Sequence, residues 1–359
     1  MEILNTSSSQ CKILISNDKK YVLRYPRKIR QTVEYYRSTP ETEVIKILQN
    51  NNVKCPKILY SNEQYSIQEY VEGQLLADKF EDHKDIEKSI IDQIVNQICL
   101  LTSVDGSELL KYASWKDNNS FYYFQCQNTE KIFIDYYKKL ETIYKKLGIS
   151  LDTIKELYKL TYQISNERKL SVIHGDRHKK NIIVSENGEI TFIDWELGCI
   201  GDLAYDIGFH LHQMAYTEED ERYFLDKIAK KFDGDSSKLL HDVEMYKLFL
   251  LARSTLYHVY WTDLEYQKNN NEDKEKQLGH FMRRYNKLSK YKIFNLEPKS
   301  QDELNSIFEE YRRKQEHIIS DENIKWFWGR GQKSLCKIKN KDSRWLSLFC
   351  SFVRFRVVR

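Results

Sequence analysis

Apolar residues recur with two different periods in the first part of the chain. In CKILISNDKKYVLRY they alternate with polar residues on both sides of Asn17-Asp18, which predicts a β-hairpin. In ETEVIKILQN, residues 41–50, they follow helical spacing. The stretches KCPKILYS and YSIQEYVEG then predict two more strands. Residues 1–73 are therefore expected to form a small, β-rich N-lobe with one helix.

From Gly73 onward the pattern is mostly helical. Three amphipathic stretches follow the helical period, and so does MYKLFLLARSTLYHVYWTDLEY farther along. Short strands return at 170–194, where Asn187-Gly188 predicts a tight hairpin turn. The polar run KNNNEDKEK, residues 268–276, predicts a solvated loop. The chain is thus expected to be an α+β, two-lobe protein whose larger helical C-lobe spans residues 74–295.

Composition narrows the class of protein. Of the 359 residues, 41% are hydrophobic and 31% charged, as expected for a globular domain pair. No run of about 18 apolar residues predicts a membrane span, and MEILNTSSSQ has no signal-peptide pattern. The seven cysteines are scattered without a CxxC pair, which favours reduced thiols over disulfides or a zinc site. A cytoplasmic location is therefore expected.

The formal net charge of +4 is unevenly distributed. Residues 325–359 hold ten Lys or Arg and one acid, so the body retains 47 basic and 52 acidic residues. A mildly acidic body does not suit nucleic acid. The tail mixes aromatic residues with cations and is compatible with an anionic membrane surface, but a disordered end has the same composition. The sequence therefore predicts no specific role for the basic C-terminal extension, residues 296–359.

Four polar residues stand where apolar strands end. His174, Asp176 and Asn181 lie in IHGDRHKKN, and Asp194 ends the strand FID. A hairpin would bring Asn181 and Asp194 together, and their oxygens suit Mg²⁺, which prefers oxygen ligands and keeps several waters. Asp176 would then face a substrate hydroxyl. These are the parts needed for phosphoryl transfer, and His-x-Asp-x-x-x-x-Asn is also the spacing of a kinase catalytic loop.

IHGDRHKKNIIV, FIDWE and GDLAYDI together resemble the aminoglycoside phosphotransferase family, which includes choline kinase-like enzymes. The resemblance implies a protein-kinase-like fold and a small-molecule kinase that uses Mg²⁺ and ATP, with GTP as an alternative. It implies that Asp176 is catalytic, with His174 holding its loop, and that Asn181 and Asp194 bind metal. Asp206 either supports that loop or starts a helix.

The resemblance also implies a nucleotide site in the N-lobe. Arg24 takes the place of the phosphate-binding cation, with Arg27 and Lys28 as competitors. Glu43 is its expected acidic partner, and Glu41 is the alternative. Backbone groups of Glu69 and Val71 would bind the base. TSSSQ stands where a glycine-rich phosphate loop is expected, which is the main departure from the family.

The acceptor is expected to be a small cationic molecule with a hydroxyl group. Candidate contacts are the acids Glu196 and Asp202, and the aromatic residues Tyr257 and Trp261, which are i, i+4 neighbours suited to cation–π contact. The same aromatic stripe would also suit a helix core. An aminoglycoside-type acceptor is favoured, choline or ethanolamine is the alternative, and a pseudokinase is a remote one, because Asp176, Asn181 and Asp194 are all present.

Overall fold

The computed structural model describes residues 2–5, 11–25, 40–82, 84–112, 134, 137–156, 171–268 and 271–319. Within them the chain forms two compact units. The first contains the described residues up to 112 together with 171–244. The second contains those from 134 to 156 together with 245–319. The division between the units falls inside the long helix α9 (Ser236–Lys268).

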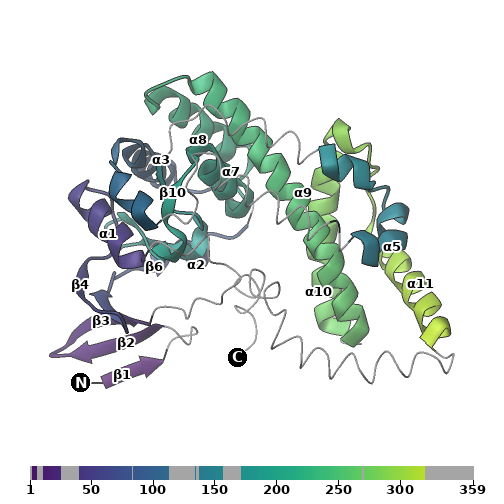
Figure 1. The fold of residues 1–359 in the computed structure, drawn as a ribbon, viewed down its shortest axis with the longest axis horizontal. Coiled ribbons are helices and arrows are strands. Elements are labelled where there is room, and N and C mark those ends of the chain that lie inside the picture. Colours follow the sequence, from purple (N-terminus) through teal and green to yellow (C-terminus); the bar gives the residue numbers. More distant parts are fainter. Residues whose placement is uncertain are drawn as a thin grey trace. The chain divides into compact units, whose positions relative to one another are not determined.

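An antiparallel five-stranded sheet opens the first unit, in the order β1-β2-β3-β5-β4 (Figure 1). Its β2–β3 hairpin turns at Asn17 and Asp18, whose φ angles of 50° and 59° suit a type I′ turn. The register of this hairpin places Cys11 opposite Arg24. The predicted hairpin is confirmed, and Arg24 ends the central strand. The strands are β1 (Glu2–Asn5), β2 (Cys11–Ser16), β3 (Lys19–Arg24), β4 (Ile58–Ser61) and β5 (Ser66–Glu69).

The predicted helix over residues 41–50 is confirmed as α1 (Glu41–Asn50). It buries Val44, Ile45 and Leu48, the positions that its spacing placed on one face. Helix α1 contacts β4 and the short 3₁₀ turn η4 (Trp195–Leu197). Because η4 directly follows Asp194, this packing brings the start of α1 close to the end of the FID strand.

Small antiparallel sheets and further helices complete the first unit. Helices α3 and α7 both contact β7, so the strand that leads into HGDRH is buried. The predicted turn at Asn187-Gly188 joins β8 to β9, with Gly188 at a φ of 80°. One sheet is β6 (Gln74–Leu75), β8 (Ile182–Val184) and β9 (Ile190–Phe192), and the other is β7 (Ser171–Ile173) and β10 (Cys199–Gly201). The helical elements are α2 (Leu76–Lys79), α3 (Lys88–Ser103), η1 (Ser107–Tyr112), η3 (Lys179–Asn181), α7 (Leu203–Met214) and α8 (Glu218–Lys231).

The second unit is helical. It consists of α5 (Glu141–Lys146), the later part of α9, α10 (Asn271–Ser289), η5 (Lys292–Phe294) and α11 (Gln301–Ile319). Helix α11 contacts both α10 and α5, and it fully buries Leu304 and Phe308 (Figure 1). Residues 301–319, which lie beyond the expected C-lobe of residues 74–295, therefore belong to this compact unit.

One local prediction is wrong. The polar run 268–276 was expected to be a loop, yet α9 continues to Lys268 and α10 begins at Asn271. Glu272 and Asp273 fall in the first turn of α10, where negative charge is favourable to a helix. The predicted α+β architecture, with a small sheet and a larger helical part, is confirmed. In the described part of the chain, no helix has the length and apolar character needed to cross a bilayer.

Candidate active site

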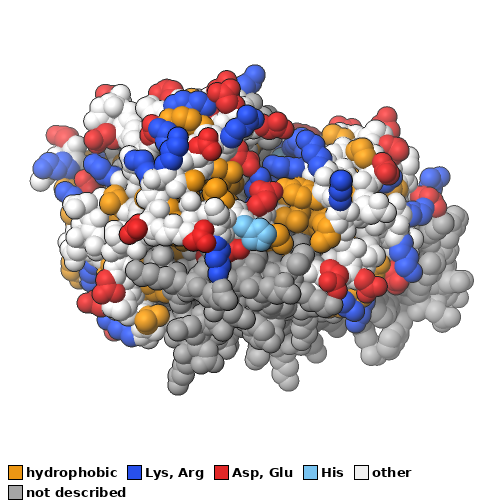
Figure 2. All heavy atoms as spheres, turned by 90° about the horizontal axis from the view of Figure 1, so that it is seen from above, with side chains coloured by type: hydrophobic (Ala, Val, Ile, Leu, Met, Phe, Trp, Pro, Cys, Tyr) orange, Lys and Arg blue, Asp and Glu red, His pale blue; other side chains and the backbone are white. Residues whose placement is uncertain are grey.

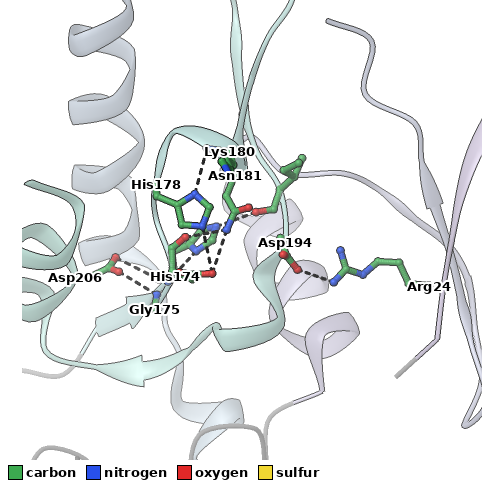
Figure 3. Close-up of polar contacts among 10 residues, drawn as sticks. Arg24, His174, Gly175, His178, Lys180, Asn181, Asp194 and Asp206 are labelled. Carbon is green, nitrogen blue, oxygen red and sulfur yellow. Dashed lines mark hydrogen bonds and ion pairs between the residues drawn. The ribbon is translucent and has the colours of Figure 1, made fainter. Parts of the chain in front are cut away.

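The β8–β9 hairpin brings Asn181 and Asp194 to the same end of a sheet. The N–H of Ile193 donates to the carbonyl of Asn181 at 3.0 Å, which extends the β8–β9 ladder by one residue. Asp194 follows immediately, with φ 63° and ψ 56°. This left-handed conformation is uncommon outside glycine and turns the chain sharply from β9 into η4. The sharp turn presents the Asp194 carboxylate beside the HGDRHKKN loop (Figure 3).

His174 holds the loop from inside. Its side chain is fully buried, and its Nε2 lies 3.0 Å from the carbonyl of Ile193 while its Nδ1 accepts from the N–H of Asp176 at 3.3 Å. Burial, together with the nearby positive charge of Arg177, lowers the pKa of His174 to about 4. The ring is therefore neutral near pH 7, with both nitrogens engaged by backbone. This geometry gives His174 a holding role and leaves neither nitrogen for a substrate.

Asp206 gathers the donors of the same loop. One of its oxygens accepts from the N–H of Gly175 at 3.0 Å. The other accepts from the N–H of His174 at 3.2 Å and from the Arg177 guanidinium at 2.6 Å. Of the two roles left open for Asp206, the structure thus supports the loop. The helix-start role falls to Asp202, whose side chain accepts from the N–H of Ala204 at 2.9 Å.

Asp176 and Asn181 are joined within the loop. The side-chain amide of Asn181 donates to the Asp176 carbonyl at 2.9 Å and to its Oδ2 at 3.4 Å. The amide nitrogen is therefore committed to Asp176, and the amide oxygen points elsewhere. No described residue donates to Oδ1 of Asp176, whose side chain is 19% exposed. The loop thus presents one carboxylate oxygen of Asp176 and one amide oxygen of Asn181.

Arg24 links the sheet to the loop. Its Nη2 donates to Oδ1 of Asp194 at 2.6 Å, and its Nε lies 2.9 Å from Glu41. Glu43, the expected partner, instead pairs with Lys46 at 2.9 Å, so that expectation is corrected in favour of Glu41. The reason is helical geometry, because a two-residue step along α1 turns the side chain to another face. Glu41 begins the helix on the face toward Arg24.

Burial and neighbouring charges together set the pKa values of Glu41 and Arg24. Desolvation raises the pKa of Glu41 to about 7 against the opposing charge of Arg24. Burial acts to lower the pKa of Arg24, but the charges of Glu41 and Asp194 outweigh it and raise that pKa above its ordinary value. Arg24 is therefore always cationic. Its guanidinium is a fixed positive charge beside the Asp194 carboxylate.

The donor set fits a magnesium ion shared with phosphates. Asn181 offers an amide oxygen and Asp194 a carboxylate, and Mg²⁺ in phosphoryl-transfer sites is held by one or two carboxylates together with phosphates and water. Among the described residues no group of three or more His, Cys, Asp or Glu side chains is placed to bind a metal. The arrangement therefore suits a hard ion that arrives with a nucleotide and not a dedicated protein-only metal site.

The base-binding candidates lie at the end of β5. The N–H of Glu69 donates to the carbonyl of Lys57 at 2.8 Å, so this donor is not available to a base. Val71 lies between β5 and β6, and no described residue pairs with its backbone N–H. Val71 thus remains the better placed of the two. Arg27, Lys28 and the TSSSQ segment lie outside the described residues.

The acceptor candidates are divided between the two units. Glu196 lies in η4, which directly follows Asp194 and contacts α1, the helix that begins at Glu41. Asp202 is buried and caps α7, so it does not face solvent. Tyr257 and Trp261 contact each other edge to face in α9, with ring centroids 5.7 Å apart. Over the face drawn in Figure 2, acidic and basic side chains are interspersed, so the charge on that face is not of one sign.

Sequence reasoning did not find Arg177. It stands in a polar loop, where a cation is expected to be solvated, yet it is fully buried against Asp206 and lies over the ring of Phe192. The pattern GDLAYDI held the only signal, because it placed an aspartate in an otherwise apolar helix. A buried aspartate requires a partner, and Arg177 is that partner.

Comparisons with known proteins agree with this geometry. The profile of the phosphotransferase enzyme family matches residues 4–240. A LicA homologue of Metamycoplasma hominis is 26% identical over 186 residues, which cover 52% of this chain and 65% of the relative. A probable choline kinase 3 of Arabidopsis thaliana is 30% identical over 121 residues, covering 27% and 35%. The chain thus spans less than two thirds of either relative.

Solved structures share the fold. An ethanolamine kinase of Plasmodium vivax superposes with a TM-score of 0.57 at 19% identity, covering 82% of each chain. The aminoglycoside phosphotransferase APH(2'')-Ib in its ADP-bound form gives a TM-score of 0.51 at 16% identity, covering 79% of this chain and 93% of that one. The expected protein-kinase-like fold is therefore confirmed.

Proposed function

This chain belongs to the phosphotransferase enzyme family, and we propose that it transfers the γ-phosphoryl group of a nucleoside triphosphate to a hydroxyl of a small cationic molecule. One observation carries the proposal. The unengaged Oδ1 of Asp176 lies in the same loop as the amide oxygen of Asn181, and Arg24 holds the carboxylate of Asp194 nearby. Phosphoryl transfer needs these groups together, since its catalysis rests on positioning and charge neutralisation.

Each residue has a proposed role in that reaction. Asp176 accepts a hydrogen bond from the acceptor hydroxyl through Oδ1, orients its oxygen for in-line attack and takes up its proton. Asn181 and Asp194 would hold Mg²⁺, which supplies neutralising charge to the phosphates. Arg24 binds phosphate oxygens, and Glu41 keeps its guanidinium in place. His174 and Asp206 hold the loop, and the backbone N–H of Val71 would meet the base.

For the acceptor, we propose an amino alcohol of the choline or ethanolamine type. The support comes from relatives that carry such names.

An aminoglycoside is the second candidate. The sequence favoured it, and APH(2'')-Ib has the same fold. A larger polycation would depend on several carboxylates, and Asp202 is buried as a helix cap. The thiols of Cys55, Cys99 and Cys199, which form no disulfide, and the nucleotide donor support a cytoplasmic location for either reaction.

A coupled assay for nucleoside diphosphate release tests the proposal. Purified protein with Mg²⁺ is given ATP or GTP and one member of a panel: choline, ethanolamine, kanamycin- and streptomycin-type aminoglycosides, a macrolide and simple sugars. We expect acceptor-dependent release with choline or ethanolamine. Asp176→Asn should lower kcat at least about 10²-fold while leaving nucleotide binding near wild type. Release with an aminoglycoside alone would favour the second candidate. Near-wild-type turnover by Asp176→Asn would overturn the proposed mechanism.

A further inference from the structure

His178 faces Asp176 across the loop from Asn181. Its Nε2 lies 3.6 Å from Oδ2 of Asp176, and its Nδ1 accepts from the N–H of Lys180 at 3.1 Å (Figure 3). The His178 and Asp176 side chains are 24% and 19% exposed, so both reach the surface of the site. Sequence reasoning gave His178 no role.

The backbone fixes the tautomer of His178. An N–H group donates to Nδ1, so this nitrogen must carry a lone pair, and the proton of the neutral ring must lie on Nε2. Nε2–H is therefore a donor directed toward the Asp176 carboxylate. At 3.6 Å the pair is just beyond hydrogen-bond length, and catalytic hydrogen bonds are often long before substrate binds and tighten in the complex.

Both donors near the Asp176 carboxylate lie on the same oxygen. Asn181 Nδ2 is 3.4 Å from Oδ2, and His178 Nε2 is 3.6 Å from that atom. The Asn181 contact is the shorter of the two, but the same amide also donates to the Asp176 carbonyl. A second donor on Oδ2 would therefore decide which carboxylate oxygen remains for the acceptor.

We infer that His178 is a positioning residue for Asp176: its Nε2–H holds Oδ2, so that Oδ1 alone is directed to the acceptor hydroxyl. This inference rests on the proposed function. It concerns orientation and excludes a proton relay. A proton arriving from Asp176 could bind only at Nδ1, which the Lys180 N–H occupies, or displace the proton already on Nε2.

A matched pair of variants separates this role from a purely structural one. His178 also caps η3 through the Lys180 N–H. His178→Asn keeps the cap, because an Asn side chain is a strong helix N-cap, but is too short to reach Asp176. His178→Gln keeps a donor at the length of Nε2. We expect His178→Asn to lower kcat about tenfold, which is less than the loss of an acid–base group costs. The KM for Mg·ATP should stay within about twofold of the wild-type value, and the thermal midpoint should not change.

His178→Gln should recover much of that kcat. If His178→Asn keeps the wild-type kcat, His178 is only a cap and the inference is wrong. If both variants lose stability and nucleotide binding together, the role is structural and the inference is also wrong.

A second measurement does not depend on turnover. In a long-range ¹H–¹⁵N spectrum of the whole protein, the imidazole signals that His178→Asn removes belong to His178. We expect them to report the Nε2–H tautomer near pH 7, and Asp176→Asn should shift the Nε2 resonance more than the Nδ1 resonance. An Nδ1–H tautomer, or an Nε2 resonance indifferent to Asp176→Asn, would overturn the inference. If the wild-type protein turned over no acceptor, the proposed function would fail, and the spectrum alone would decide this contact.

Discussion

Arg24 and Asp194, separated by 170 positions in the sequence, are joined by a hydrogen bond of 2.6 Å between Nη2 and Oδ1. The same guanidinium lies 2.9 Å from Glu41. One cation therefore holds the first residue of α1 and the carboxylate that would bind magnesium. In the proposed reaction Asp194 would hold the metal and Arg24 would bind phosphate. Glu41 is then the contact that keeps Arg24 in the site.

Glu41→Ala should weaken Mg·ATP binding, and Glu43→Ala should not. A charge-assisted hydrogen bond of this kind contributes about 1.5–3 kcal/mol, which corresponds to roughly ten- to hundredfold in Kd. Glu43 is the matched control, because it pairs with Lys46 where both side chains are substantially exposed, and its loss should change Kd less than about threefold. Calorimetric titration with Mg·ATP measures both. Equal effects of the two substitutions would contradict the assignment of Glu41.

Gly175 and Gly188 give a second matched pair. Both have positive φ angles, 76° and 80°, so alanine is strained at either position. At Gly188 a Cβ would meet no atom within 4 Å, whereas at Gly175 it would lie 2.6 Å from the carbonyl oxygen of Leu197. Gly188→Ala should therefore cost about 1 kcal/mol in the free energy of unfolding, and Gly175→Ala about 2 kcal/mol more.

Urea unfolding of the two alanine variants measures this difference. Gly175→Ala should also reduce turnover, because the shifted loop carries Asp176. Similar stabilities for the two variants would mean that the close approach to Leu197 is relieved without cost.

Local patterns in the sequence were sufficient to predict the elements around the site. The alternation around Asn17-Asp18 and the turn at Asn187-Gly188 are short-range signals, and both hairpins form where predicted. They are enough to place Arg24 at a strand end and to bring Asn181 beside Asp194. The spacing of IHGDRHKKN then predicts the rest of the loop, because few residues separate its members.

Several features that the sequence did not predict depend on long-range contacts. The choice between Glu41 and Glu43 depends on which face of α1 meets Arg24, and both acids lie in the first turn. Burial of Arg177 depends on Asp206, which is 29 residues away. Helix α11 has a polar sequence with few apolar anchors, and only its packing on α10 and α5 reveals that it belongs to the second unit. Apart from the aspartate in the apolar pattern GDLAYDI, these contacts have no signature in the neighbouring sequence.

The pH dependence of stability should contain two opposing contributions. The pKa of His174 is about 4 in the folded protein and 6.5 ordinarily, so the unfolded state binds more protons between these values. Stability from His174 is therefore lost as the pH falls through this window, by up to about 3 kcal/mol. Glu41 acts in the opposite direction: its pKa rises from 4.5 to about 7, so the folded state binds more protons and stability falls as the pH rises through that window.

Unfolding free energies at about pH 7 and about pH 5 separate the two contributions. Glu41→Gln should lose more stability on acidification than the wild type, because the compensating carboxyl is gone. His174→Asn should lose less. If both variants followed the wild-type change in unfolding free energy, neither pKa would be shifted as the structure indicates.

The extent of the second unit can be tested by truncation at two positions. A chain that stops after Asn295 lacks α11, whose Phe308 stacks on Tyr266 at 5.2 Å and meets Phe281 edge to face at 5.9 Å. Loss of one such buried aromatic side chain costs about 3–5 kcal/mol, so this chain should melt markedly earlier or aggregate. A chain that stops after Ile319 retains those contacts and should keep the wild-type thermal midpoint and acceptor-dependent turnover. Because the two chains differ only in residues 296–319, the comparison isolates this segment. Equal stability of the two truncated chains would mean that α11 is not part of the second unit's core. Loss of turnover in the longer chain would mean that residues 320–359 take part in the reaction.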